Sequence, residues 1–172
     1  MHSLEGTQLA DVSIIDQPTH IQLLAQIEIL LDPSEPPLTL MANLASLLFW
    51  SLPGINWVGF YLSDGERLVL GPFHGKPACT VILLGSGVCG TAARERRTLN
   101  VADVETFPGH IACDSASRSE VVIPLVLDGE LWGVFDVDSP EAARFDDETQ
   151  SFLEKTAEIF LSRIGNKSVF PS

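Results

Sequence analysis

The chain has 172 residues, 45% of them hydrophobic, and a formal net charge of −13 from 23 acidic and 10 basic side chains. This length is enough to bury a core without disulfide staples, so we expect one domain over residues 1–172. The acidic balance repels phosphate backbones and anionic lipid head groups, which argues against nucleic acids and membranes as partners.

No apolar run approaches the roughly 18 residues of a membrane span, and the first residues, MHSLEGTQ, lack the order of a signal peptide. We therefore expect a cytoplasmic protein, in which thiols stay reduced. The three cysteines, Cys79, Cys89 and Cys113, cannot all pair, which argues against a structural disulfide framework. Because the sequence has no C-x-x-C and no close Cys/His pair of finger-like spacing, we expect no metal site and no cofactor.

Two helices are predicted near the N-terminus. Residues 1–18 show no clear period and are expected to be a partly ordered lead-in. Residues 19–31 predict a helix capped by Thr19. Its expected apolar positions, near 3.6 spacing, are Ile21, Leu24, Ile27, Ile29 and Leu31. Residues 38–52 predict a second helix, which is apolar almost all round and therefore expected to be buried.

The pattern then changes to short runs that are typical of strands. Residues 56–62 and 68–73 are separated by Ser-Asp-Gly-Glu, a hairpin signal. Residues 79–84 predict a third strand, and the glycines of GSGVCG predict a turn into a short helix over residues 88–96. Residues 100–102 predict one more brief strand.

The clearest hairpin joins residues 121–127 to residues 130–137 through Asp128-Gly129, which is typical of a type I′ turn. Pro124 lies inside the first arm and removes one backbone donor, which argues for an edge position or a bulge there.

A long helix is predicted to follow, with Asp146 as its cap, an end near Ile164, and a short tail over residues 166–172. Its apolar stripe is Phe152, Leu153, Ala157, Phe160, Leu161 and Ile164. Helices at both ends of a run of hairpin-linked strands predict an α+β fold, an antiparallel sheet with helices packed on it.

Two acids share one face of the second hairpin arm. Strand alternation puts Asp136 and Asp138 on the side of Trp132 and Val134, with Leu131, Gly133, Phe135 and Val137 on the other side. Carboxyl groups this close raise one another's pKa, so one is a candidate proton donor near neutral pH; the alternative is a solvated strand end.

Glu120 joins these acids only if the strand register is irregular. A strict two-residue turn pairs Glu120 with Val137 and so places it on the opposite face. We predict an irregularity, either a bulge near Pro124 or a change at the strand end, that brings Glu120 to the two acids.

The segment PGHIACDSASRSE, residues 108–120, surrounds Cys113 with small and polar residues. Free cysteines are normally buried, so a thiol in such a segment indicates a reactive cysteine. Cys89 lies in a glycine-rich turn that opens a helix, where backbone N–H groups favour a thiolate, although a structural role fits equally well. Cys79, in the run ACTVILL, is by itself typical of a buried small hydrophobe.

Trp57 and Tyr61 lie four residues apart in the first predicted strand and therefore on one face. Their usual role is core packing, and the alternative is an apolar wall for a small ligand. Neither Ser86 nor Ser119 lies in a G-x-S-x-G elbow, which argues against serine hydrolysis.

Several stretches together resemble one known family. NWVGFYL, LVLGPFHGKPAC, GSGVCGTAA, FPGHIACDSASRSE, GVFDVDSP and RFDDE are similar to the free methionine-(R)-sulfoxide reductases, which are GAF-domain enzymes. The resemblance runs from about residue 21 to residue 164 and includes all three cysteines. It implies a GAF-like α+β fold, with a six-stranded antiparallel sheet, N- and C-terminal helices on one face and a closed pocket on the other.

The resemblance implies a role for each cysteine. Cys113 matches the cysteine that attacks the sulfoxide sulfur, and Cys79 matches the one that resolves it. Cys89 matches a third family cysteine, an alternative resolving or attacking partner. Ser86 departs from the family pattern, because many relatives have a basic residue there.

The resemblance also implies the reaction, the reduction of free L-methionine-(R)-sulfoxide. Glu120, Asp136 and Asp138 match the acids that hold the substrate and protonate its oxygen, and Trp57 and Tyr61 match the aromatic wall. Attack leaves a sulfenic acid, then an intramolecular disulfide that a thioredoxin-type dithiol reopens. Such an activity belongs to the defence against oxidative stress.

Two other functions fit the residues. One is a GAF-type sensor that binds a small molecule and catalyses no reaction. The three cysteines, the acids and the lack of an expected output domain argue against it. The other is a redox sensor whose cysteines react directly with peroxide. Related domains often form dimers, so a homodimer is compatible with the sequence.

Overall fold

The structure is a computed structural model of the chain and describes residues 18–109 and 116–165. Its helices are α1 (His20–Leu30), α2 (Pro37–Ser51), α3 (Gly87–Glu95), the short 3-10 helix η1 (Val104–Thr106) and α4 (Asp147–Ile164). Its strands are β1 (Trp57–Ser63), β2 (Arg67–Gly75), β3 (Val81–Leu83), β4 (Leu99–Val101), β5 (Ser119–Leu127) and β6 (Glu130–Ser139).

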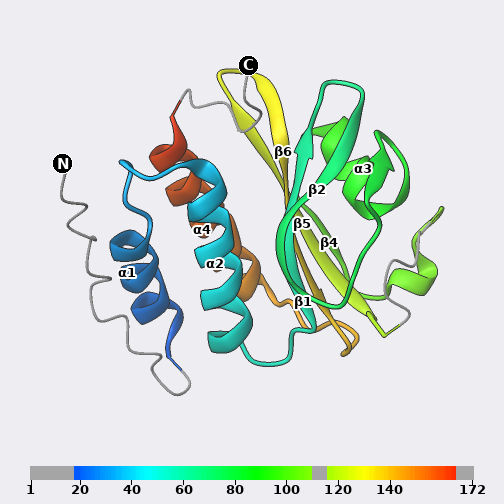
Figure 1. Cartoon of the computed structure of the whole chain (residues 1–172). Coiled ribbons are helices and arrows are strands. Elements are labelled where there is room, and N and C mark those ends of the chain that lie inside the picture. Colours follow the sequence, from blue (N-terminus) through cyan, green and yellow to red (C-terminus); the bar gives the residue numbers. More distant parts are fainter. Residues whose placement is uncertain (1–17, 110–115, 166–172) are drawn as a thin grey trace.

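The six strands form one antiparallel sheet in the order β3-β2-β1-β6-β5-β4. Helices α2 and α4 cover one face of the sheet, with α1 packed outside them, and α3 lies on the opposite face (Figure 1). This arrangement confirms the predicted α+β fold with N- and C-terminal helices on one face. Within the described ranges, no helix has the length and apolarity that a membrane crossing requires.

The helix ends follow the chemistry of their capping residues. The Thr19 hydroxyl accepts a hydrogen bond from the Gln22 backbone N–H, and the Gln22 side chain accepts one from the Thr19 N–H, so α1 begins with a capping box. At α4 the Asp146 carboxylate accepts from the Thr149 N–H at 2.8 Å, and Gly165 follows the last turn. The two predicted caps are confirmed.

The predicted apolar faces of the first two helices need correction. Of the positions predicted for the first helix, Ile27 and Leu31 are buried, together with Leu23, whereas Ile21 and Ile29 are 81% and 63% exposed. Both sets have helical spacing, and only the position of α2 and α4 decides which set is covered. In α2, Trp50 is 63% exposed, so this helix is buried on one face and not all round.

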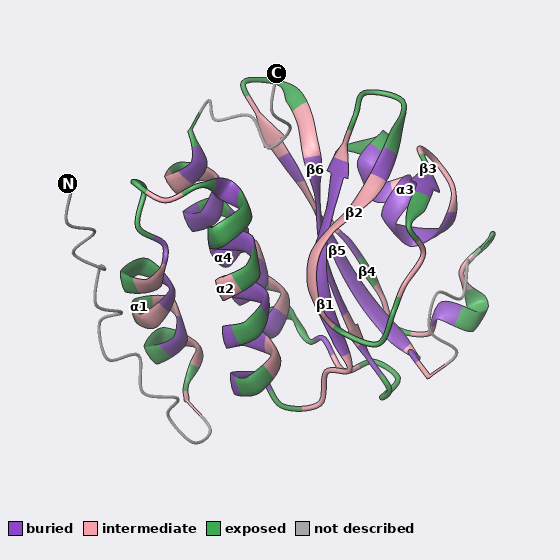
Figure 2. Ribbon diagram, viewed as in Figure 1, coloured by how far each residue is buried: buried purple, intermediate pink, exposed green. Residues whose placement is uncertain are grey.

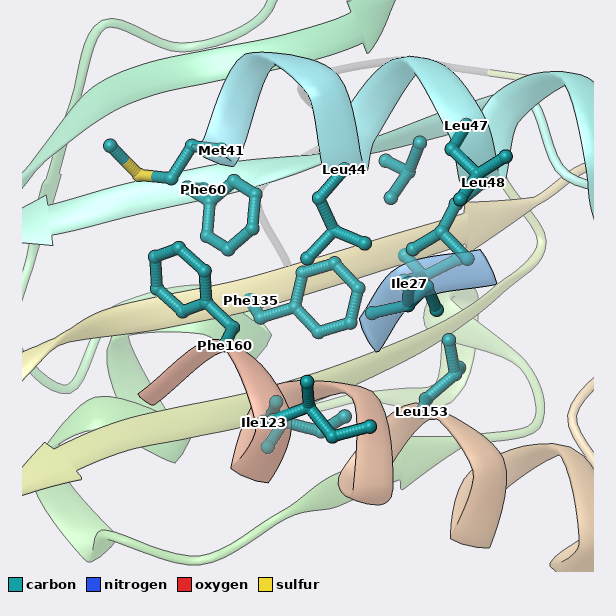
Figure 3. Packing of buried hydrophobic residues seen from close by; sticks show 14 of the residues in the cluster. Ile27, Met41, Leu44, Leu47, Leu48, Phe60, Ile123, Phe135, Leu153 and Phe160 are labelled. Atoms are coloured by element: carbon teal, nitrogen blue, oxygen red, sulfur yellow. The ribbon is translucent and has the colours of Figure 1, made fainter. Parts of the chain in front are cut away.

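The larger core lies between the sheet and the helices. Phe60 of β1 is the centre of an aromatic group, with its ring centroid 5.2 Å from that of Phe135 and 5.1 Å from that of Phe160 (Figure 3). Aliphatic side chains from α1, α2 and α4 close over these rings. The strands in the middle of the sheet are buried along most of their length (Figure 2).

A bulge in the β5–β6 hairpin sets the register of the sheet's centre. Asp128 and Gly129 have φ of 50° and 83°, as a type I′ turn requires. Leu131 pairs with Val126 but Gly133 pairs with Leu125, so Trp132 is an extra residue in β6. Pro124 lies next to this bulge, and β4 pairs only with residues 120–122, so Pro124 needs no partner on that side.

The bulge has two consequences for the faces of the sheet. Glu120 now lies opposite Asp138, and Val122 opposite Asp136, which confirms the predicted irregularity. The predicted faces of Leu131 and Trp132 are wrong, because the extra residue reverses the alternation on that side of the bulge. Trp132 packs on the helix side, with its ring 5.6 Å from Phe160, and Leu131 packs on the other side.

We expect Trp132 and Phe160 to be coupled energetically because their rings touch edge to face. A double-mutant cycle with Trp132→Ala and Phe160→Ala, measured by urea unfolding, should give a coupling of about 0.5–1.5 kcal/mol. The same cycle with Leu131→Ala is the matched control and should give almost none. Coupling of Leu131 instead of Trp132 would show that the bulge is misplaced.

Candidate functional site

A pocket lies on the face of the sheet that α3 covers. It encloses about 540 Å³ of space, part of it open to solvent, between β1, β5, β6, the start of α3 and the segment before β3. A concave site with apolar walls and a few convergent polar groups suits a small-molecule ligand. Its lining combines aromatic side chains with an unusual number of acids.

The strand register places the floor of the pocket. Trp57 lies opposite Asp138, and Asp138 lies opposite Glu120, in one row across β1, β6 and β5. In the next row Asp136 lies between Gly59 and Val122. The three predicted acids and Trp57 therefore meet on one face, although they come from three strands.

Cys89 completes a buried cluster with two of these acids. Its Sγ lies 3.2 Å from Asp136 Oδ2 and 3.8 Å from Glu120 Oε1, so the thiol donates toward both carboxyl groups. Exposed fractions are 5% for Cys89, 7% for Glu120 and 5% for Asp136. Asp136 Oδ1 is buried and has no hydrogen-bond partner within the described part of the chain.

Burial controls the ionisation of this cluster. It raises the pKa of Asp136 to about 7, and burial beside Asp136 raises the pKa of Glu120 well above its usual value. Burial and the neighbouring carboxylates also raise the pKa of the Cys89 thiol, which is therefore protonated at neutral pH. The cluster can hold a proton at neutral pH and give it to a bound group.

An aromatic wall stands beside the acids. The Trp57 ring stacks on Tyr61 at 5.9 Å and on Phe73 at 5.3 Å between centroids, and its indole N–H donates to the Lys76 carbonyl at 3.1 Å. Gly59 leaves room for this ring, because a Cβ there would lie 2.6 Å from Trp57 Cη2. Trp57 and Tyr61 are thus on the pocket face, as their spacing predicted.

The glycine-rich turn positions α3 against the sheet. A Cβ on Gly90 would lie 2.3 Å from the Leu83 carbonyl oxygen, so only glycine allows this approach. Gly85 and Gly87 have positive φ, which glycine adopts readily. Ser86, the N-cap residue, makes no side-chain capping bond, so the first N–H groups of α3 lack that partner, and residues 86–89 line the pocket.

The three cysteines differ in position. Cys89 is a free buried thiol in the pocket wall. Cys79 is half-buried and precedes β3, instead of lying in the strand as predicted. It packs against the smaller group of buried side chains on the α3 side of the sheet, and it is disulfide-bonded. Cys113, His110 and Asp114 lie outside the described residues.

The segment that follows the undescribed residues 110–115 is held at the pocket. Ser117 lines it and accepts a hydrogen bond from the Asn56 side-chain amide at 3.1 Å. The Arg118 N–H donates to the Ser139 carbonyl at 2.7 Å, and the Arg118 carbonyl accepts from the Val104 N–H at 2.9 Å. Ser117 and Lys76, which both line the pocket, were not predicted as site residues. The one feature of the sequence that points to them is their position in the polar segments around Cys113 and Cys79.

Comparison with known proteins defines the class. A GAF domain family model matches residues 36–162. Over 118 residues the chain is 49% identical to the free methionine-R-sulfoxide reductase of Escherichia coli, covering 69% of this chain and 72% of that protein. It is 44% identical over 127 residues to the free methionine-R-sulfoxide reductase of Saccharomyces cerevisiae, covering 69% and 71%.

Solved structures give the same result. The structure of fRMsr of Staphylococcus aureus in complex with substrate matches with a TM-score of 0.82 and 43% identity, covering 88% of this chain and 99% of that one. Fold and pocket thus define a GAF domain with an acid-lined ligand site. Within that class, the chain belongs to the family of the free methionine-R-sulfoxide reductases.

Gly59→Ala should damage both packing and the aromatic wall. The new Cβ would lie 2.4 Å from Phe73 Cβ and 2.9 Å from its Cα, so β1, Trp57 or Phe73 must move. We expect a loss of about 1–3 kcal/mol in the free energy of unfolding, with altered Trp fluorescence. Gly71→Ala is the matched control, since its nearest contact is 3.0 Å. An equal loss in both variants would show that the close approach of Phe73 and Trp57 does not limit the space at Gly59.

The raised pKa of Asp136 predicts that stability depends on pH. Because folding raises this pKa from 3.8 to about 7, the protonated acid favours the folded state at low pH, and stability is lost as pH rises through that window. Asp136→Asn should remove a fall on the order of 4 kcal/mol at most. Urea unfolding from about pH 4 to pH 8 measures it, with the exposed Glu130→Gln as control. A fall that persists unchanged in Asp136→Asn would contradict the prediction.

Proposed function

We propose that this protein reduces free L-methionine-(R)-sulfoxide to methionine. The observation that carries the proposal is the buried group of Glu120, Asp136 and Cys89 beside an aromatic wall. A sulfoxide sulfur becomes electrophilic when its oxygen is protonated or hydrogen-bonded, and this pocket offers acids that are protonated near neutral pH. The names of the relatives agree with this substrate.

The two ends of an amino acid find complementary groups in the pocket. Asp138 of β6, half-buried and opposite Glu120 of β5, provides negative charge for the substrate ammonium. The N-terminus of α3 provides backbone N–H groups for the carboxylate. Peptide-bound methionine lacks the free ammonium and would lose this ion pair, which costs about 1–3 kcal/mol or more.

The sulfoxide end would lie against Trp57 and Tyr61, with its oxygen toward the Glu120–Asp136 pair. Both rings are buried and form an apolar surface that suits a methyl group. The carboxyl pair would give its proton to the sulfoxide oxygen as the sulfur is attacked. Cys89, whose thiol donates to Asp136, would orient this carboxyl group instead of attacking.

Cys113 would supply the attacking thiolate. Its sulfur bonds to the sulfoxide sulfur as the sulfoxide oxygen takes up a proton. The resulting hydroxyl passes from the substrate sulfur to the Cys113 sulfur, the transient bond between the two sulfurs breaks, and methionine leaves with Cys113 oxidised to a sulfenic acid. The Cys79 thiol then attacks that sulfur, water leaves and a disulfide forms; the disulfide-bonded state of Cys79 in the structure supports this role. An external dithiol such as thioredoxin would reduce the disulfide, which suits a cytoplasmic protein, with or without homodimer formation.

The proposal is tested by incubation with both enantiomers of free methionine sulfoxide and a thioredoxin system. We expect turnover of the R form only, none in Cys113→Ser, and a single stoichiometric turnover in Cys79→Ser because the sulfenic acid is not resolved. Cys89→Ser should keep turnover, since a hydroxyl still donates to Asp136, whereas Asp136→Asn should reduce the rate by about 10²–10⁴. Methionine release and thiol loss are measured together.

N-acetylated methionine sulfoxide is the matched control substrate and should not react. Binding of methionine sulfoxide without turnover would favour the sensor function instead. Peroxide reactivity combined with indifference to the sulfoxide would favour the redox sensor.

A further inference from the structure

The cluster of Cys89, Glu120 and Asp136 has the geometry of a metal site. One ligand atom from each, a sulfur and two carboxylate oxygens, lies within 4.8 Å of the others. Zinc bonds of about 2.3 Å to sulfur and 2.0–2.2 Å to oxygen set neighbouring tetrahedral ligands roughly 3.5 Å apart. The two S···O distances, 3.2 Å and 3.8 Å, bracket that value.

A second observation points to a missing cation. Only 5% of Asp136 is exposed, yet its Oδ1 has no hydrogen-bond partner among the described residues. A buried carboxylate oxygen without a partner is costly, and a bound cation removes that cost. Lys76 is the one basic side chain among the described lining residues, and it is exposed on the segment before β3.

We propose that Cys89, Glu120 and Asp136 bind a thiophilic divalent cation of the zinc class when the pocket holds no organic ligand. On binding, the Cys89 thiol loses its proton to solvent, a metal–sulfur bond forms, and the carboxylates supply two oxygens. A water molecule completes four-fold coordination. The thiolate selects zinc or cadmium over magnesium and calcium, which prefer oxygen ligands.

Cation binding would control access to the pocket. The ion would use oxygens that line the pocket, so ion and amino-acid ligand would exclude each other. This exclusion rests on the proposed function, whereas cation binding itself does not.

Cadmium is a suitable probe because its thiolate complexes absorb in the ultraviolet. The full-length Cys79→Ser/Cys113→Ser variant retains Cys89 as its single thiol, and the Cys79→Ser/Cys89→Ser/Cys113→Ser variant is the matched control. We expect a saturable charge-transfer band at one equivalent of Cd²⁺ in the first variant and none in the control. Excess Mg²⁺ should not reduce the band, and Zn²⁺ should displace it.

The carboxylates are tested in the same single-thiol background. Glu120→Gln and Asp136→Asn should each weaken Cd²⁺ binding by about tenfold or more, because each replaces a charged carboxylate ligand by a neutral amide. Binding that is equally tight in both would show a thiol that captures cadmium unaided, and would overturn the proposal. Absence of the band in the folded single-thiol variant, with circular dichroism as the check, would overturn it too.

The reduced wild-type protein gives a measurement that does not depend on multiple substitutions. Stoichiometric Zn²⁺ should raise its Tm, since ligand binding to the folded state stabilises it, and Cys89→Ser should lose that increase. An increase that survives in Cys89→Ser would contradict the site. If Cd²⁺ binds but methionine sulfoxide does not displace it, the metal site stands and the proposed substrate fails.

Discussion

One extra residue in β6 determines where the acids lie. Trp132 interrupts the hairpin pairing, and every residue of β6 after it is thereby shifted by one position against β5. Without that shift, Glu120 would face the helices, among side chains such as Val121, Ile123 and Phe135, where a carboxyl group would find no polar partner. The bulge also turns the large Trp132 ring into the core. The packing on the helix face and the acid cluster on the pocket face therefore depend on the same bulge. A slip of the strand register would disrupt both faces.

The acid cluster lowers the stability of the folded state, and the surrounding structure offsets this loss. Burying Glu120 and Asp136 near each other destabilises their charged forms, and the two raised pKa values express this. Around them, β1 and β5 are paired on both sides of β6, and the helix-side core is continuous beneath. A site built on the middle strands of a sheet holds its groups more accurately than one built on loops. The two buried acids thus lie on the middle strands of the sheet, above the continuous helix-side core.

The sequence was sufficient for the elements, the caps, the hairpin turn and the need for an irregularity near Pro124. These features are local, because each depends on residues within a few positions of each other. It was not sufficient for the covered face of α1, where Ile21 and Ile29 have the same spacing as the residues that are buried. Nor did it show that Trp132 is the bulged residue or that Cys89 touches Asp136. The first depends on how the Trp132 ring packs against α4, and the second requires α3 to be docked on the sheet, and no local pattern specifies either.

The position of Cys89 explains why one thiol in the pocket is not enough for thiol chemistry. A nucleophilic cysteine needs a thiolate, and cationic or helix N-terminal surroundings favour one. Cys89 is near the N-terminus of α3, yet burial and the carboxylates of Asp136 and Glu120 oppose ionisation more strongly, so its proton is retained. The same acids that would protonate a sulfoxide oxygen in the proposed reaction therefore disfavour the nearest sulfur as a nucleophile. An attacking thiol must come from a segment outside the acid cluster, which gives the proposed division of roles among the cysteines a physical cause.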